Sequence, residues 1–202
     1  MKKFFLHLMG TFGSGKTTVA RSIGEHLGVQ FDPGGHVHQS EDNSCLLLGK
    51  HSNRGQYHGM DGASMTQVER FDLIEKYWES DYRLIIVDGS MIMYWSSFWE
   101  RYQHLPSSRQ VWGVLLTVPN EVIKERFVSR SGKDWSEKRE ANVQQKRNSA
   151  NTTFSKAREI PSYRMERIKH YNEDHFQHLM KKITRVTGLD VTDCKLKDND
   201  RK

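Results

Sequence analysis

The sequence predicts an α/β fold in which a parallel sheet is covered by helices on both faces. Stretches with strand-like patterns alternate along the chain with stretches whose apolar residues recur at helical spacing, as in folds built from strand–helix–strand units. The run Leu84-Ile85-Ile86-Val87 is apolar at every position, which is typical of a strand buried on both faces of a parallel sheet. The predicted molecule therefore has three layers, with the sheet in the middle.

The first half of the chain contributes three of five expected strands. Val19, Ile23 and Leu27 recur at helical spacing and support the first helix. The expected order is a strand at 3–9, a helix at 17–27, a short strand at 29–31, a helix at 64–78, a strand at 84–88 and a helix at 91–102. Residues 32–64 are rich in Gly, His, Asn and Ser and are too long for a plain connection, so we expect a functional loop there.

The second half completes the pattern. Pro119 suits the first turn of a helix, and Asn172 suits an N-cap. The expected order is a strand at 111–118, a helix from Pro119 to about 129, a polar helix at 135–156, a strand at 165–171 and a last helix that ends near Gly188. We expect one domain at 1–188, with a helical lid at about 130–157, followed by a charged and frayed tail at 189–202.

Length and composition exclude several classes of protein. The 202 residues suit one domain, and no apolar run approaches the roughly 20 residues of a membrane helix, so we expect no membrane partner. The apolar start contains His7 and leads directly into a glycine-rich motif, which favours a strand over a signal peptide. Cys45 and Cys194 are far apart in sequence and form no disulfide framework, which predicts a cytoplasmic protein.

The positive charge of the chain lies in one segment. The formal net charge is +6, and residues 120–170 hold 13 Lys and Arg against 7 Asp and Glu, a surplus of 6. A basic surface of this kind attracts polyanions such as nucleotides or nucleic acid. A solvated helical face is an equally good interpretation of the same pattern.

A phosphate-binding loop is the most specific motif. Residues 10–17, Gly-Thr-Phe-Gly-Ser-Gly-Lys-Thr, match G-x-x-x-x-G-K-[ST] between an expected strand and an expected helix. The glycines let backbone N–H groups turn toward phosphate oxygens, Lys16 reaches the β and γ phosphates of ATP, and the Thr17 hydroxyl can ligate Mg²⁺. The predicted nucleotide-binding residues are Gly10, Gly13, Ser14, Gly15, Lys16, Thr17 and Thr18.

A second acidic element supports this interpretation. Asp88 ends the apolar strand that begins at Leu84, as the acidic residue of a Walker B motif does. A strand beside the phosphate loop would aim this carboxylate at the metal, so we assign Asp88 to Mg²⁺ through a water molecule. An ordinary carboxylate at a strand end is the alternative.

Three cations and two carboxylates complete the candidate site. Arg126 and Arg130 lie four apart on one helical face, and Lys133 follows Gly132, so together they could clamp phosphates; surface arginines at this spacing are also often merely solvated. Asp32 follows the second expected strand and could accept the proton of an acceptor hydroxyl. Asp61, in the 32–64 loop, is the second candidate for that base, and either carboxylate could simply cap a turn.

At these residues the chain resembles the P-loop kinases of the nucleoside monophosphate kinase type. The resemblance rests on the loop at 10–17, the strand that ends at Asp88, Arg126 and Arg130, and the closing strand and helix. It implies a five-stranded parallel sheet and ATP with Mg²⁺ as cofactors. Phe31-Asp32-Pro33-Gly34-Gly35 is similar to the Arg-Glu-Pro-Gly-Gly stretch of thymidylate kinases, but Gly89 stands where those enzymes carry a monophosphate-binding arginine.

The chain looks still more like small divergent kinases of bacteriophages, in which a Gly-x-Asp-Gly segment and a basic lid recur. Some of these relatives phosphorylate 5-hydroxymethyluracil within DNA, which would take place in the host cytoplasm. With the localised charge, the resemblance favours transfer of the γ-phosphate to that hydroxymethyl group. A deoxynucleoside monophosphate kinase and a nucleotide-dependent switch without an acceptor are the alternatives. The oligomeric state is not predicted.

Overall fold

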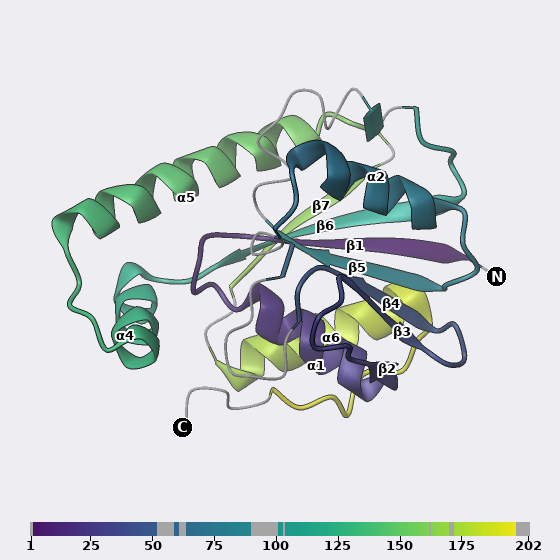
Figure 1. Ribbon diagram of the computed structural model, residues 1–202, viewed down its shortest axis with the longest axis horizontal. Coiled ribbons are helices and arrows are strands. Elements are labelled where there is room, and N and C mark those ends of the chain that lie inside the picture. Colours follow the sequence, from purple (N-terminus) through teal and green to yellow (C-terminus); the bar gives the residue numbers. More distant parts are fainter. Residues whose placement is uncertain are drawn as a thin grey trace.

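The computed structural model describes most of the chain as one sheet with helices on both faces (Figure 1). The described residues are 2–51, 59–60, 64–89, 101–102, 104–161, 163–169 and 172–196. The strands are β1 (Lys3–Met9), β2 (Val29–Gln30), β3 (Val37–Ser40), β4 (Cys45–Leu48), β5 (Leu84–Asp88), β6 (Arg109–Thr117) and β7 (Tyr163–Lys169). The helices are α1 (Lys16–His26), α2 (Gln67–Trp78), α4 (Asn120–Ser131), α5 (Glu137–Ala157) and α6 (Glu173–Thr187).

The sheet has seven strands in the order β2-β3-β4-β5-β1-β6-β7, so the prediction of five strands is wrong. Its five-stranded parallel part, β4-β5-β1-β6-β7, matches the expected architecture, but β4 takes the place that we gave to residues 29–31. β3 pairs antiparallel with both β4 and β2, so residues 29–30 lie at the sheet edge. The supposed loop at 32–64 therefore contributes two strands. The buried run Cys45-Leu46-Leu47-Leu48 was the signal for one of them.

Alternate residues of the central strands feed two separate cores. Phe4, Leu6 and Leu8 of β1 face the core between the sheet and helices α1 and α6. Phe5 and Met9 face the core between the sheet and helices α2 and α5. The same alternation holds in β4 and β5, which explains why these strands are apolar at consecutive positions. Figure 1 shows α1 and α6 below the sheet and α2 and α5 above it, which confirms the three predicted layers.

Side chains cap the starts of α2 and α6, whereas Pro119, which we expected in the first turn of a helix, is the N-cap residue of α4. The Thr66 side chain accepts a hydrogen bond from the Glu69 N–H, and the Thr66 N–H donates to the Glu69 carboxylate, so α2 begins with a capping box. The side chain of Asn172 caps α6, as expected. The helix expected at 91–102 lies almost entirely outside the described residues.

The chain remains packed beyond residue 188, contrary to the expectation of a frayed tail. Leu189, Val191 and Cys194 are buried in the core that α1 and α6 form with the sheet. The Cys194 thiol donates to the Ser22 carbonyl at 3.1 Å, and the Gln177 amide donates to the Cys194 carbonyl at 2.8 Å. The residues that pack here, at positions 189, 191 and 194, are apolar, although many residues of the segment 189–202 are charged. Residues 197–202 lie outside the described part.

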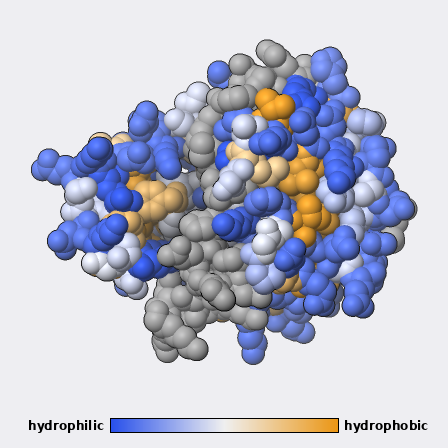
Figure 2. Space-filling view, in the orientation of Figure 1, coloured by the Kyte–Doolittle hydropathy of each residue, from blue (hydrophilic) through white to orange (hydrophobic). Residues whose placement is uncertain are grey.

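Helices α4 and α5 form a projection at the left of Figure 1. The second half of α5 is anchored, since Ala150, Phe154 and Ala157 are buried against the core above the sheet. The first half extends beyond the sheet beside α4, and Figure 2 shows a mostly hydrophilic surface there. Helix α5 covers most of residues 130–157, and the role of this segment as a lid stays a prediction.

Among the described residues, no helix combines the length and the apolar character needed to cross a membrane.

Stability should depend on pH through His38 of β3. Burial, followed by the neighbouring His51, lowers the His38 pKa from 6.5 to about 4. The Asp32 N–H donates to Nδ1 at 3.2 Å and Nε2 donates to the Gly49 carbonyl at 3.0 Å, a pattern that needs the neutral ring. The unfolded chain therefore binds this proton more tightly, so His38 should cost stability as pH falls from about 6.5 toward 4, by roughly 3 kcal/mol at most.

Urea unfolding at a series of pH values checks this expectation. The His38→Gln variant has an amide that can accept from Asp32 and donate to Gly49 without titrating. Its free energy of unfolding should fall less steeply than that of the wild type below pH 6.5. Parallel curves for the two proteins would show that His38 does not titrate in this window.

Candidate functional site

The phosphate-binding motif forms the turn between β1 and α1, as its pattern requires. Gly10, Gly13 and Gly15 have φ values of 142°, 74° and 90°, which favour glycine. A Cβ at Gly10 would lie 2.5 Å from the Leu116 carbonyl oxygen and 2.6 Å from the Ser14 hydroxyl. The loop therefore needs glycine at position 10 both for its backbone conformation and for its close packing against β6.

The ammonium group of Lys16 is held across this loop. Its Nζ donates to the carbonyl oxygens of Gly10 and Thr11, each at 3.0 Å, and the residue is 8% exposed. These two contacts hold the ammonium group at the loop. Together with the helix N-terminus that follows, it makes the loop a site for anions.

Asp88 lies beside the loop because β5 pairs in parallel with β1. The register places Asp88 opposite Leu8, two residues before the motif begins at Gly10. The Thr17 hydroxyl donates to Asp88 Oδ2, and Asp88 is 1% exposed. The structure thus brings together the two residues that we assigned to Mg²⁺. A hydroxyl and a carboxylate are hard oxygen donors of the kind that this ion prefers.

Three further residues contact Asp88, and the sequence offers no reason to expect any of them there. His51 Nε2 lies 3.3 Å from Asp88 Oδ1, with both side chains buried. Gly59 packs directly on the carboxylate, since a Cβ there would lie 2.2 Å from Oδ2. The Met60 N–H donates to the Asp88 carbonyl at 2.9 Å. Neither the phosphate-binding motif nor the Walker B motif contains these residues, and the pairing of Lys50 with Gly59 that brings them here is a tertiary contact.

A buried histidine fixes the chain just after Asp88. His7 Nε2 donates to the Gly89 carbonyl at 2.9 Å, which leaves Nδ1 to accept from the Tyr163 hydroxyl at 3.1 Å. Burial raises the pKa of Tyr163 well above its usual value, so this hydroxyl stays protonated and can donate. The polar side chain that interrupts the first apolar strand thus links β1, β7 and the end of β5.

Among the predicted phosphate clamps, Arg126 contacts the loop. Its Nη1 donates to the Gly13 carbonyl at 2.7 Å. Arg130 lies exposed in the last turn of α4, and Lys133 is exposed after it. The roles of these three cations stay predictions.

Aromatic side chains connect the loop to α4 and to the segment between α4 and α5. The Phe12 ring lies 6.2 Å from that of Phe127 and 6.4 Å from that of Trp135. The Arg139 guanidinium lies 3.9 Å from the centre of the Phe127 ring. Phe12 occupies one of the variable positions of the motif, so this contact with α4 and α5 is specific to the chain rather than to the pattern.

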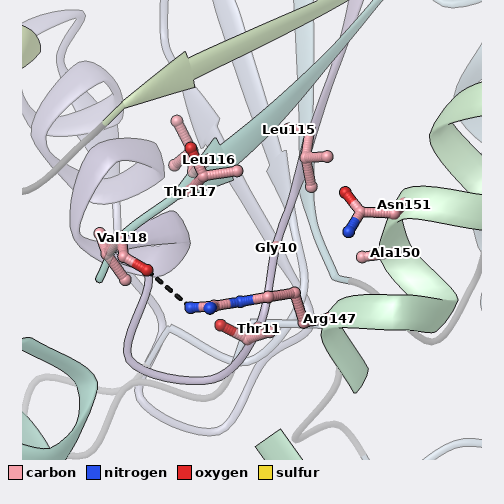
Figure 3. Close-up of a pocket in the computed structure, with 9 residues that line it drawn as sticks. All are labelled: Gly10, Thr11, Leu115, Leu116, Thr117, Val118, Arg147, Ala150 and Asn151. Carbon is pink, nitrogen blue, oxygen red and sulfur yellow. Dashed lines mark hydrogen bonds between the residues drawn. The ribbon is translucent and has the colours of Figure 1, made fainter. Parts of the chain in front are cut away.

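A small pocket lies between the loop, the end of β6 and α5 (Figure 3). Arg147 of α5 reaches into it and donates to the Val118 carbonyl at 2.8 Å. Its lining residues are Gly10, Thr11, Leu115, Leu116, Thr117, Val118, Arg147, Ala150 and Asn151. Because residues of the loop and of α5 line the same pocket, α5 lies beside the loop there.

Asp32 forms a turn at the carboxyl end of the strands. Its Oδ1 accepts from the Gly34 N–H at 3.1 Å, and the residue is exposed. The preceding residue, Phe31, packs its ring 6.3 Å from that of His51, so Asp32 lies at the same end of the sheet as Asp88. The turn-capping role that we considered is present, and it leaves Oδ2 available for another partner. Asp61 lies outside the described residues.

The comparisons with known proteins agree with this geometry. A family model described as an AAA domain matches residues 7–148. A gluconokinase structure from Sinorhizobium meliloti 1021 is 17% identical and has a TM-score of 0.51, with 92% of this chain and 94% of that chain covered. A shikimate kinase from Acinetobacter baumannii in complex with shikimate is 18% identical, with the same coverage and TM-score.

A sugar kinase structure from Janibacter sp. HTCC2649 is 16% identical, covers 96% of this chain and 98% of that chain, and has a TM-score of 0.50. No curated protein matches the chain. The family model spans more than half of the 202 residues, and the similar folds are those of P-loop kinases. The chain therefore belongs to the AAA domain family and has the fold of the P-loop kinases.

Proposed function

We propose that the protein is an ATP-dependent phosphotransferase. The observation that carries the proposal is the meeting of Lys16, Thr17 and Asp88 at one end of the sheet, two of them on the phosphate-binding loop and its helix. Each group has a use in phosphoryl transfer, where catalysis consists largely of positioning and of stabilising the charge of the transferred group.

The side chains fit a Mg²⁺–ATP complex. Asp88 Oδ1 is buried and has no hydrogen-bond partner among the described residues, and an unpaired buried acceptor costs about 1–3 kcal/mol unless the functional state satisfies it. When bound, Mg²⁺ would neutralise charge on the phosphate oxygens. Thr17 and Asp88 would hold it, and Lys16 would bind the β and γ phosphates. Arg126, which already contacts Gly13, lies close enough to the loop to join them.

For the acceptor we propose a nucleotide, with 5-hydroxymethyluracil in bacteriophage DNA as the preferred candidate. The support is the resemblance to bacteriophage kinases together with the charge of residues 120–170. Many cations of this segment are exposed: Lys124, Arg130, Lys133, Lys138, Lys156, Arg158, Arg164, Arg167 and Lys169. A DNA backbone offers several phosphates to such a surface, whereas one mononucleotide offers few. Asp32 is the proposed base, and Asp61 is the alternative.

A panel of acceptors tests this assignment. Labelled ATP is offered with a duplex that contains 5-hydroxymethyluracil, the same duplex with thymine, deoxynucleoside monophosphates, gluconate and shikimate. We expect label only in the 5-hydroxymethyluracil duplex. Label in a monophosphate would favour the nucleotide kinase alternative, and label in gluconate or shikimate would favour an acceptor like those named for the similar structures. Slow ATP hydrolysis with no labelled acceptor would favour the switch.

Replacement of Lys16 by alanine should abolish phosphoryl transfer. The variant loses the only ammonium recorded across the loop in the described structure, so the rate should fall by about 100-fold or more. Thermal unfolding should change little, because Lys16 contacts loop carbonyls rather than either core. Lys195→Ala, at an exposed position away from the loop, is the control and should behave as wild type. Wild-type turnover in Lys16→Ala would remove the loop from the mechanism.

Replacement of Asp32 by asparagine should slow transfer without weakening ATP binding. Asparagine keeps the oxygen that accepts from Gly34 but cannot take a proton, so the rate should fall roughly 10²-fold or more. Asp42→Asn is the matched control. Asp42 caps a similar turn by accepting from the Ser44 N–H, but this turn precedes β4 and so lies at the opposite end of the sheet from Asp32. Equal rates for the two variants would refute the role of Asp32, and a larger loss in Asp61→Asn would place the base at Asp61.

A further inference from the structure

The geometry points to His51 as a positioning residue for Asp88. We propose that His51 donates a hydrogen bond from Nε2–H to Asp88 Oδ1 and thereby fixes the orientation of the carboxylate in the loaded site. The inference rests on the proposed function, because it requires Asp88 to serve the Mg²⁺ of a nucleotide complex.

The first argument is the state of the buried polar atoms. His51 and Asp88 are each 1% exposed, and Nε2 lies 3.3 Å from Oδ1. At that distance the two groups are close enough for an ion pair, yet neither Nε2 nor Oδ1 has a correctly aligned hydrogen-bond partner among the described residues. Buried polar atoms in native proteins are nearly always paired, so a small rotation that aligns these two is the simplest way to satisfy both.

The second argument is that the surroundings hold His51 in place. Arg21 donates to the His51 carbonyl at 3.4 Å, and the His51 ring packs 6.3 Å from that of Phe31 and 5.4 Å from that of His38. Gly49, two residues earlier, accepts a hydrogen bond from His38. These contacts fix the backbone and one side of the ring, and they leave Nε2 directed at Asp88.

The third argument is that the two oxygens of Asp88 have different neighbours. Oδ2 accepts from the Thr17 hydroxyl, whereas Oδ1 faces His51. A carboxylate held at one oxygen can still rotate, but one held at both has a fixed plane. The Thr17 hydroxyl, once it donates its proton to Oδ2, directs its lone pairs away from Asp88. His51 would therefore orient the ligand set indirectly, as residues that hydrogen-bond to metal ligands do.

Variants of His51 separate this role from simple packing. In His51→Gln an amide N–H can reach the place of Nε2, whereas His51→Leu has no donor. His51→Asn is polar but too short to reach Oδ1, and it replaces the leucine variant if that protein does not fold. His26→Gln is the control, since His26 is an exposed histidine near the end of α1 whose ring contacts the Asp190 carbonyl.

The measurement is the dissociation constant of ATP by calorimetry, once with Mg²⁺ and once with EDTA. We expect His51→Leu to weaken ATP binding about tenfold or more with Mg²⁺, the size typical of lost contacts to metal ligands, and much less in EDTA. His51→Gln should recover most of the affinity, and His26→Gln should bind as wild type. The effect of His51→Leu should also shrink in an Asp88→Asn background, because the two residues act as a unit.

Three results would overturn the inference. These are wild-type Mg²⁺–ATP affinity in His51→Leu or His51→Asn, equal weakening with and without Mg²⁺, and additive effects of the His51 and Asp88 replacements. Failure of the proposed function is a distinct outcome, because in that case the wild-type protein itself would not bind ATP in the presence of Mg²⁺.

Discussion

The site depends on one constraint, the parallel pairing of β1 and β5 with their carboxyl ends side by side. Because Leu8 lies opposite Asp88, the loop that follows β1 starts beside this carboxylate, and Thr17 at the start of α1 reaches it. A shift of the register by one residue would turn Asp88 to the other face of the sheet. The consecutive apolar positions of β1 and β5, which pack into two cores, hold that register.

The projection formed by α4 and α5 contacts the same loop at two points and the residue after β6, beside the loop, at a third. Phe12 packs against Phe127 and Trp135, Arg126 donates to Gly13, and Arg147 donates to Val118 beside the loop. These arginines contribute to the structure beside the loop, and other cations of the segment are exposed. Our proposal of an anionic acceptor rests on that exposed positive charge.

The parts of the molecule that local chemistry determines were predictable from sequence. The glycines and Lys16 of the loop lie within eight residues, and Asn172 caps its helix through a contact three residues away. The approach of His51 and Gly59 to Asp88 was not predictable, because it depends on the pairing of β4 with β5 and on a bridge between Lys50 and Gly59. The polar composition of residues 32–64 concealed β3 and β4, since only the four residues from Cys45 to Leu48 are continuously apolar.

A crystal structure with Mg²⁺ and a non-hydrolysable ATP analogue tests the central claim most directly. The account predicts that the backbone N–H groups of the loop surround the phosphates and that the Lys16 ammonium moves from the carbonyls of Gly10 and Thr11 to phosphate oxygens. The metal should lie beside the Thr17 hydroxyl, with Asp88 nearby. A nucleotide bound elsewhere, with Lys16 still on the two loop carbonyls, would contradict the account.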